Sequence, residues 1–132
     1  MHRTLTFLAC SWLAMAASAQ DVRIELRLAD TTLVLNDRHA LTKEELSASR
    51  GIGVTVAMPD SMRAVEVVQF TLAAQVNGAL LEGVSQSGEL TAEQRAILIK
   101  LAPGDTFYLE EISVRDAQGA VRRCGSRAVV IR

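Results

Sequence analysis

The sequence predicts a mainly β domain with one α-helix, arranged as a β-sandwich. Apolar and polar residues alternate in Val22–Leu28 and within Ala64–Val76, as they do in strands with one buried face. The second of these strands is followed by Asn77-Gly78, and both residues accept the positive φ angles of a type I′ hairpin turn. Only Thr91–Leu101 has the cap and the apolar spacing of a full amphipathic helix. Short strands separated by turns, with one such helix, are typical of a sandwich domain.

The first residues have the organisation of a secretory signal peptide. A short basic start is followed by the apolar run Leu5–Ala17 and by the small residues Ala17–Ala19. The run is shorter than the roughly 20 residues that span a bilayer. We therefore expect residues 1–19 to be removed by cleavage near Ala19. The remainder, 20–132, would be a single domain without a membrane span, located in the periplasm or outside the cell.

Local signals also predict the elements between the first strand and the long one. The β-branched and apolar run Thr31–Leu35 predicts a second strand. Within Leu41–Leu46, Thr42 and Glu45 have the spacing of a capping box, which predicts a short helix. Ile52–Met58 predicts the next strand, and the proline and aspartate after it form a break. The buried face of the long strand is then expected to consist of Val68, Phe70, Leu72, Ala74 and Val76.

The C-terminal half continues with a hairpin, a helix and a second hairpin. Ala79–Ser85 is the expected return strand after Asn77-Gly78. Thr91 caps the helix with Gln94, and Pro103-Gly104 ends it. The sequence next predicts, in order, a strand Phe107–Val114, a turn Asp116–Gly119, and a closing strand with Val129 and Ile131 facing inward.

Composition excludes several classes of partner and site. The formal net charge of −1 and the aromatic content of 4% favour neither nucleic acid nor a membrane surface as partner. Once the signal peptide is removed, Cys124 is the only cysteine, so an internal disulfide or a cysteine metal cluster is not expected. We expect Cys124 to be half-buried in a strand, and the alternative is pairing with another chain.

Asp105, Glu110 and Glu111 form the acidic cluster that most resembles a catalytic site. Neighbouring residues of a regular strand point to opposite faces, so Glu110 and Glu111 would not share a cleft. The apolar alternation of Phe107–Leu109 also resumes in the opposite phase in Ile112–Val114. A β-bulge between the two glutamates would explain this change of phase without any chemistry. The sequence therefore favours an architectural role for the cluster over a catalytic one.

The remaining candidates for a site also have simpler structural explanations. His39 lies in a polar connector beside Asp37 and lacks the partners of a metal site or a catalytic triad. Gly51–Gly53 lacks the rest of a dinucleotide-binding motif, and no serine lies in a G-x-S-x-G context. A basic cluster is expected to pair with Glu110 and Glu111 or to bind an acidic partner; it consists of Arg115, Arg122, Arg123 and Arg127. We expect no catalytic, cofactor-binding or metal-binding residues.

The order of motifs in the second half resembles the C-terminal domain of the gliding-motility protein GldM and its PorM relatives. The matching segments begin with a Val-x-x-Phe-Thr strand at Val67–Thr71 and a helix that ends in Lys100-Leu101. Next come a Pro-Gly-Asp stop at Pro103–Asp105 and an aromatic strand with an acidic pair before isoleucine at Phe107–Ile112. An Asp-x-x-Gly turn at Asp116–Gly119 follows. The short helical segment Leu41–Ile52 is also similar, so the resemblance covers roughly residues 36–132.

This resemblance implies an immunoglobulin-like β domain without catalytic residues. In that family the domain ends a long dimeric periplasmic shaft of the type IX secretion and gliding machinery, and it meets outer-membrane-associated components. The chain departs from the family in its predicted cleavable signal, in having no membrane anchor and in having room for one domain. We therefore expect a free-standing domain that keeps the binding surface and does not transmit force from the inner membrane.

Together these observations predict a non-enzymatic exported domain that binds a protein partner at the cell envelope, for example an outer-membrane-associated secretion component. The alternative is a small secreted enzyme or hydrolase inhibitor that uses Asp105, Glu110 and Glu111. A third hypothesis is a homodimer formed through Cys124 or through an exposed strand edge.

Overall fold

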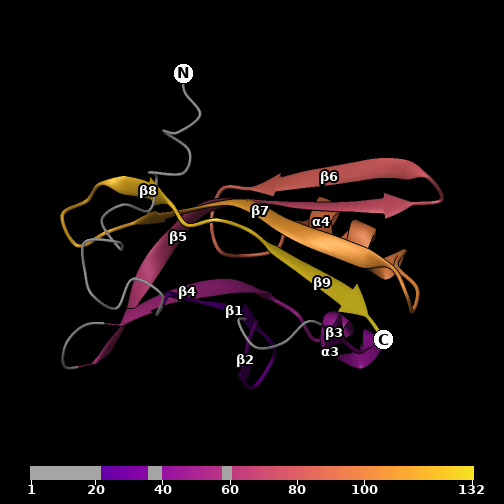
Figure 1. The fold of residues 1–132 in the computed structure, drawn as a ribbon, viewed down its shortest axis with the longest axis horizontal. Helices are drawn as coiled ribbons and strands as arrows, with labels where there is room; N and C mark the ends of the chain where they lie inside the picture. The colour runs from indigo at the N-terminus through magenta and orange to yellow at the C-terminus, as the bar shows by residue number, and fades with distance from the viewer. Residues whose placement is uncertain (1–21, 36–39, 58–60) are drawn as a thin grey trace.

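The computed structural model describes residues 22–35, 40–57 and 61–132 (Figure 1). The predicted signal peptide, His39 and the predicted break after Met58 lie outside this part of the chain. Within it the fold is mainly β, as predicted, with two helices. Neither helix is long and apolar enough to cross a membrane. The elements are β1 (Val22–Arg27), β2 (Thr32–Val34), β3 (Ala40–Leu41), α3 (Lys43–Ser47), β4 (Gly51–Ala57), β5 (Met62–Val76), β6 (Ala79–Ser85), α4 (Ala92–Ile99), β7 (Thr106–Arg115), β8 (Val121–Arg123) and β9 (Arg127–Ile131).

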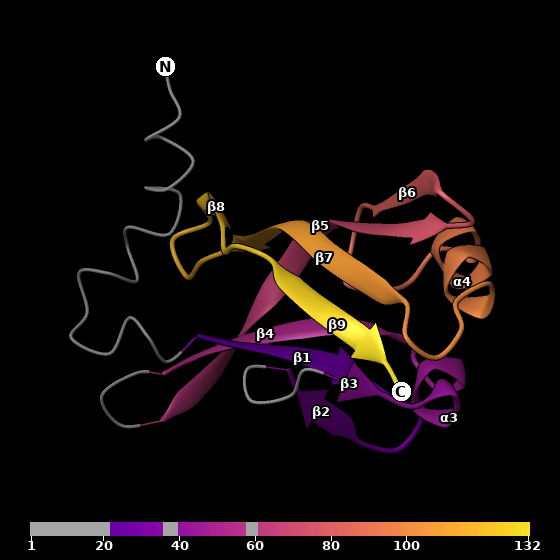
Figure 2. The ribbon, with the colours of Figure 1, turned by 45° about the vertical axis from the view of Figure 1, so that its right-hand side comes forward.

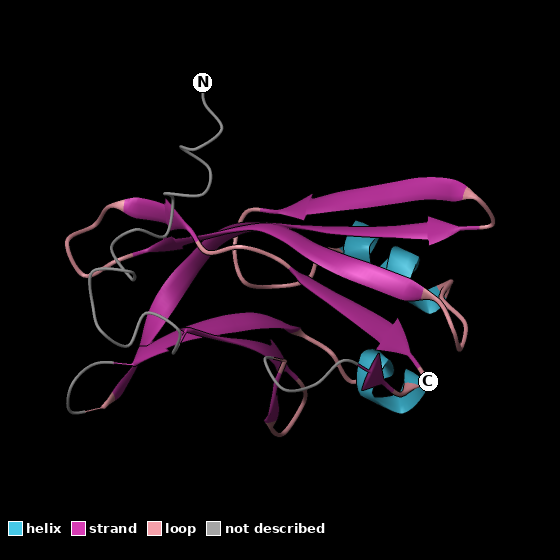
Figure 3. Cartoon of the chain, viewed as in Figure 1, coloured by secondary structure: helices cyan, strands magenta, loops and turns pink. Residues whose placement is uncertain are grey.

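The strands form one continuous hydrogen-bonded path. Its order is β2-β1-β4-β5-β7-β9-β3, with β6 paired to β5 and β8 paired to β7. The 15-residue strand β5 makes this possible, because it pairs with β4 near its start and with β6 and β7 farther along. In Figures 1 and 3, β5 runs from the layer that contains β1, β2 and β4 to the layer that contains β6, β7 and β9. The mainly β class is confirmed, while the immunoglobulin-like sandwich stays a prediction, since β5 joins both groups into one curled sheet.

The core contains the apolar side chains of both groups of strands and of the two helices. Phe70 and Phe107 are its largest fully buried side chains. Val129 and Ile131 of β9 point into it, as predicted, and α4 contributes Ile97 and Leu98. Figure 2 shows α4 beside the ends of β5 and β6, with α3 below it. Both groups of strands and both helices therefore contribute to a single core.

Both helices begin at the predicted capping boxes. The Thr42 hydroxyl accepts a hydrogen bond from the Glu45 amide at 3.1 Å, and the Glu45 carboxylate accepts one from the Thr42 amide at 3.0 Å. Thr91 and Gln94 repeat this arrangement at α4, with both bonds at 3.0 Å. The side chains satisfy amide groups that have no partner within the helix. The starts of both helices could therefore be predicted from contacts between residues three positions apart.

The predicted buried face of β5 is wrong at one position. Val67 is buried and Val68 is only half-buried, although alternation from Phe70 predicts the reverse. Val67 pairs with Val114 and Gln69 pairs with Ser113, so Val68 is an extra residue on β5. Such a bulge shifts the side-chain alternation by one residue. Because Val67 and Val68 are adjacent and equally apolar, the sequence pattern could not show which of them faces inward.

Leu41 pairs with Ile131 in the parallel pairing of β3 with β9, and it directly precedes Thr42, the N-cap residue of α3. One smaller prediction also needs correction. Cys124 is half-buried, as expected, but it lies in the connection between β8 and β9. Its backbone amide donates to the Ile112 carbonyl at 2.7 Å, which holds this connection against β7. This correction concerns a contact between distant segments, which local patterns do not report.

Candidate protein-binding surface

Glu110 and Glu111 lie at a β-bulge, as predicted. Glu110 pairs with Thr71 and Ser113 pairs with Gln69, so Glu111 and Ile112 together face the single residue Phe70. Glu111 has a φ angle of 52°, in the left-handed region that favours glycine. The bulge keeps Leu109 and Ile112 on the buried side although they are three residues apart. Its position opposite Phe70 explains the change of apolar phase.

The conformation of Glu111 gives a direct test of this architectural role. The Glu111 carboxylate accepts a hydrogen bond from the Thr71 hydroxyl at 3.2 Å, which partly offsets the cost of the positive φ. Glu111→Gly relieves the backbone strain but loses this bond, so we expect unfolding in urea to show a change in stability within about 1 kcal/mol. Glu111→Val should destabilise by about 1–2 kcal/mol or more, since a β-branched residue fits the left-handed region poorly. Equal losses of stability in the glycine and valine variants would contradict a role for the positive φ angle of Glu111 in the bulge.

Asp105 has a separate structural role at the end of the α4 segment. Its carboxylate accepts a hydrogen bond from the Ala102 amide at 2.8 Å, and its own amide donates to the Ala102 carbonyl at 2.9 Å. Gly104, with a φ angle of 96°, lies in this turn and donates to the Ile131 carbonyl at 2.7 Å. The predicted Pro-Gly stop is thus a hydrogen-bonded turn between α4 and β7, and Gly104 attaches this turn to the end of β9.

The outward side of the β6-β5-β7 sheet, called the outer face below, carries three exposed apolar side chains on its two flanking strands. Directly paired residues share a face, and Leu72, which points inward, pairs with Gly83. The intervening residues of the three strands therefore point outward. Leu80, Val84 and Tyr108 are 60%, 47% and 40% exposed. The outer face consists of Thr71, Ala73 and Gln75 of β5, Leu80, Glu82 and Val84 of β6, and Thr106, Tyr108 and Glu110 of β7.

A shallow hollow of about 680 Å³ lies over this face. Ala73 forms part of its lining, with Glu82 and Tyr108 paired to it on either side. Asp105 and Glu110 also line it, so the structure brings these two members of the acidic cluster to the same hollow. Glu111 is not among the lining residues, and none of those residues is a lysine or an arginine. The hollow is therefore acidic, with an apolar component from Leu80 and Tyr108.

Both helices lie on the opposite side of this sheet. The Gln94 side chain is fully buried, and its amide donates to the carbonyl of the inward-facing Gly83 at 2.9 Å. A side chain at Gly83 would overlap Gln94, so the glycine allows α4 to approach β6 closely. Within the described part of the chain, no helix covers the outer face.

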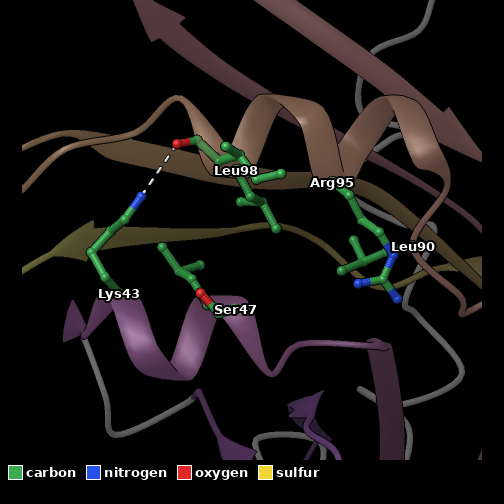
Figure 4. A pocket seen from close by; sticks show the side chains of 7 residues that line it. Lys43, Ser47, Leu90, Arg95 and Leu98 are labelled. Carbon is green, nitrogen blue, oxygen red and sulfur yellow. Dashed lines mark hydrogen bonds between the residues drawn. The ribbon is translucent and has the colours of Figure 1, made fainter.

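A second hollow, of about 370 Å³, lies between α3 and α4 (Figure 4). The Lys43 ammonium donates to the carbonyls of Leu101 and Ile99 at 2.6 and 3.3 Å, at the end of α4. Arg95 in turn donates to the Ser49 carbonyl at 3.0 Å, just beyond α3. Each helix thus supplies a cation to the C-terminal end of the other, where carbonyls lack partners. These contacts give the hollow a structural explanation.

The basic cluster is distributed over several structural contacts. Arg122 donates through Nε to the Asp116 carboxylate at 2.9 Å, and Arg115 Nε lies 3.4 Å from a carboxylate oxygen of Glu66. The acidic partners are therefore Asp116 and Glu66, whereas the sequence predicted Glu110 and Glu111 in this role. Arg127 donates to the adjacent Ser126 carbonyl at 3.3 Å. The predicted turn Asp116–Gly119 gave the only sequence signal for the role of Asp116.

Asp116 holds the β7–β8 turn together and should make stability depend on pH. The hydrogen bond from Arg122 holds the pKa of Asp116 below its usual value. Hydrogen bonds from the amides of Ala120 and Gln118 also lower this pKa, whereas desolvation raises it. Because the folded-state pKa is lower than the unfolded one, this stabilisation is present above about pH 4. It is lost as the pH falls through the folded-state pKa.

We therefore expect acid to destabilise the wild type more steeply than Asp116→Asn below about pH 4. Urea unfolding at a series of pH values would measure the difference. Glu89, whose pKa is lowered by a hydrogen bond from Arg27, contributes the same sign in the same range. Glu89→Gln is therefore the matched control, and it should leave the contribution of Asp116 in place. Parallel pH profiles for the wild type and Asp116→Asn would contradict the role of Asp116.

The geometry defines a mainly β domain with an exposed sheet face that carries apolar and acidic groups. In the described ranges, no group of three or more His, Cys, Asp or Glu residues is placed to hold a metal ion. The chain matches no protein-family model, and a search of curated proteins gives no significant match.

Proposed function

We propose that the chain is a non-enzymatic exported domain that binds a protein partner at the cell envelope. The outer face is the observation that carries this proposal. It presents Leu80, Val84 and Tyr108 to solvent around an acidic hollow. Exposed apolar groups bordered by polar ones are characteristic of protein interaction sites, and tyrosine is enriched at interfaces. The predicted signal peptide and the resemblance of residues 36–132 to the GldM C-terminal domain support an envelope location and an immunoglobulin-like fold.

The structural contacts of the acidic cluster favour binding over catalysis. Asp105 closes a turn and Glu111 occupies the bulge, so each has a role in the fold. If the cluster instead served an enzyme, Asp105→Asn, Glu110→Gln and Glu111→Gln would keep the fold and abolish turnover. We expect these variants to show no such selective loss when circular dichroism and hydrolysis of model ester, peptide and glycoside substrates are measured together. A folded variant that lost a measurable wild-type activity would support the alternative.

Affinity capture from envelope extracts tests the proposal. The wild-type chain should recover a specific partner, and Tyr108→Ala should recover at least several-fold less, since aromatic residues dominate interface energetics. Ile99→Ser is the matched control, because Ile99 is 76% exposed but lies on α4, away from the outer face. Equal recovery by Tyr108→Ala and wild type would exclude the outer face as the binding surface. Recovery of no specific partner would contradict the proposed function.

A further inference from the structure

Strand β6 has a free edge along its whole length. It pairs with β5 from Ala79 to Ser85 and, within the described residues, with no strand on its other side. The strands β2, β3 and β8 also have a single neighbour, but they are only two or three residues long. The unpaired amide and carbonyl groups of an edge strand provide a template for another strand. The seven residues of β6 are long enough for such pairing.

The hairpin turn determines which backbone groups of β6 are free. Asn77 and Gly78 have φ angles of 53° and 82°, which fit a two-residue type I′ turn. Val76 and Ala79, on either side of the turn, therefore form a hydrogen-bonded pair, and hydrogen-bonded pairs then recur every second residue. It follows that Leu81 and Gly83 direct their backbone groups to β5. The free edge presents the amides and carbonyls of Leu80, Glu82 and Val84.

The same three residues place their side chains on the outer face. An added strand would therefore find backbone partners and exposed apolar side chains at the same positions. Proteins often protect such edges with proline, lysine or a bulge. β6 contains neither proline nor lysine, and its pairing with β5 continues without a register shift. Glu82 is its only charged residue, so this residue sets the charge preference of the edge.

Charge distinguishes a basic partner from a second copy of the chain. A two-fold antiparallel pairing of two β6 strands that used all three free positions would place Glu82 opposite Glu82 of the other copy. Like charges directly opposite one another are destabilising, whereas opposite charges stabilise a strand pair. The hollow beside β6 adds the carboxylates of Asp105 and Glu110, and no cation lines it. Both observations favour a cationic segment over self-association.

We infer that the free edge of β6 binds an extended segment of a partner protein as an additional β-strand. The segment carries a lysine or arginine opposite Glu82 and apolar residues opposite Leu80 and Val84. Main-chain hydrogen bonds supply affinity in this mode, and alternate side chains supply specificity. This inference rests on the proposed function and assigns it a surface and a class of partner.

Backbone hydrogen exchange measured by NMR tests the inference with a defined probe. The probe is the peptide Thr-Val-Thr-Lys-Thr-Val-Thr, and its matched control replaces the lysine by glutamate. Addition of the lysine peptide should slow exchange at the amides of Leu80, Glu82 and Val84. The amides of Leu81 and Gly83, already bonded to β5, should change little. The glutamate peptide should bind more weakly, by on the order of threefold or more.

Two substitutions separate the backbone and charge contributions. Val84→Pro removes an outward-facing amide, which an edge strand tolerates better than the loss of an inner hydrogen bond. It should abolish peptide binding, while the matched variant Val84→Thr should retain it. Glu82→Lys should reverse the preference, so that the glutamate peptide binds more tightly. This reversal tests the inference even if Val84→Pro does not fold.

Several outcomes would overturn the inference. One is that raising the protein concentration alone protects the three amides, and another is that the peptide changes the chemical shifts of Tyr108 without protecting β6. The others are that the lysine peptide does not bind, or that Glu82→Lys leaves the preference between the two peptides unchanged. Capture from envelope extracts distinguishes this failure from failure of the proposed function. Equal recovery of a specific partner by wild type and folded Val84→Pro would overturn the edge inference alone. Recovery of no specific partner by the wild type would contradict the proposed function itself.

Discussion

Replacing Phe70 by alanine is expected to lower the free energy of unfolding by about 3–5 kcal/mol, which is a large part of the stability of a small domain. Phe70 is fully buried and lies where two bulged strands meet, opposite Glu111 and Ile112. It also pairs with Ser85 at the end of β6. Removal of the ring would leave a cavity between elements whose positions are fixed by these pairings. Urea unfolding followed by circular dichroism would measure the loss.

Tyr108→Ala is the matched control for this prediction. It removes an aromatic ring of similar size from the neighbouring strand β7, but from the outer face, where Tyr108 is partly exposed. We expect its free energy of unfolding to change by about 1 kcal/mol or less. Similar losses in Phe70→Ala and Tyr108→Ala would show that the assignment of the two faces of this sheet is wrong.

Gly51→Ala is expected to destabilise the domain by roughly 3 kcal/mol, the upper part of the usual range for overpacking. Gly51 begins β4 and is bridged to Glu89 of the loop before α4. A methyl group here would overlap the carbonyl oxygen of Gly88, which also accepts a hydrogen bond from the Ile52 amide at 2.7 Å. The overlap is with backbone, so the loop itself must move. Thermal and urea unfolding would measure the effect.

Gly53→Ala provides the control within the same strand. The nearest atom to a methyl group at Gly53 is a Glu25 carboxylate oxygen at 3.6 Å, an ordinary contact distance. Alanine also loses less conformational freedom than glycine on folding, so we expect this variant to be neutral or slightly more stable. If Gly53→Ala were as destabilising as Gly51→Ala, the close approach of the loop to β4 would not be the cause.

Local signals in the sequence were sufficient for much of the fold. The capping boxes at Thr42 and Thr91 predicted where both helices begin, because a cap is a contact between residues three positions apart. Asn77-Gly78 predicted a two-residue turn, and β6 has the predicted bounds. The phase change around Glu110 and Glu111 predicted a bulge, which the pairing of β7 with β5 confirms.

Predictions that depended on a distant partner were less successful. The second bulge, at Val68, left no phase break that the sequence could reveal, because both Val67 and Val68 are apolar. The cations that Lys43 and Arg95 supply to the opposite helix ends depend on how α3 and α4 meet. The acidic partners of Arg115 and Arg122 likewise depend on the positions of Glu66 and Asp116 in the fold.

The candidate surface could be predicted only in part. The alternation of Phe107 and Leu109 indicated that Tyr108, between them, would point to the other face of its strand. It could not show that Asp105 and Glu110 line one hollow with Glu82, since these residues come from separate strands and a turn. Nor could it show that β6 has a free edge, because that depends on which strands remain to pair with it.

The mainly β class, the helix starts, the hairpin turn and the bulge at the acidic pair could be predicted from the sequence, because each is set by residues close together in the chain. The order of the strands, the valine that faces inward and the faces left exposed depend on the fold as a whole. They could not be predicted, since β pairing joins residues far apart in sequence and many registers satisfy the same local alternation. In this chain the 15-residue strand β5 resolves that choice by pairing with three other strands.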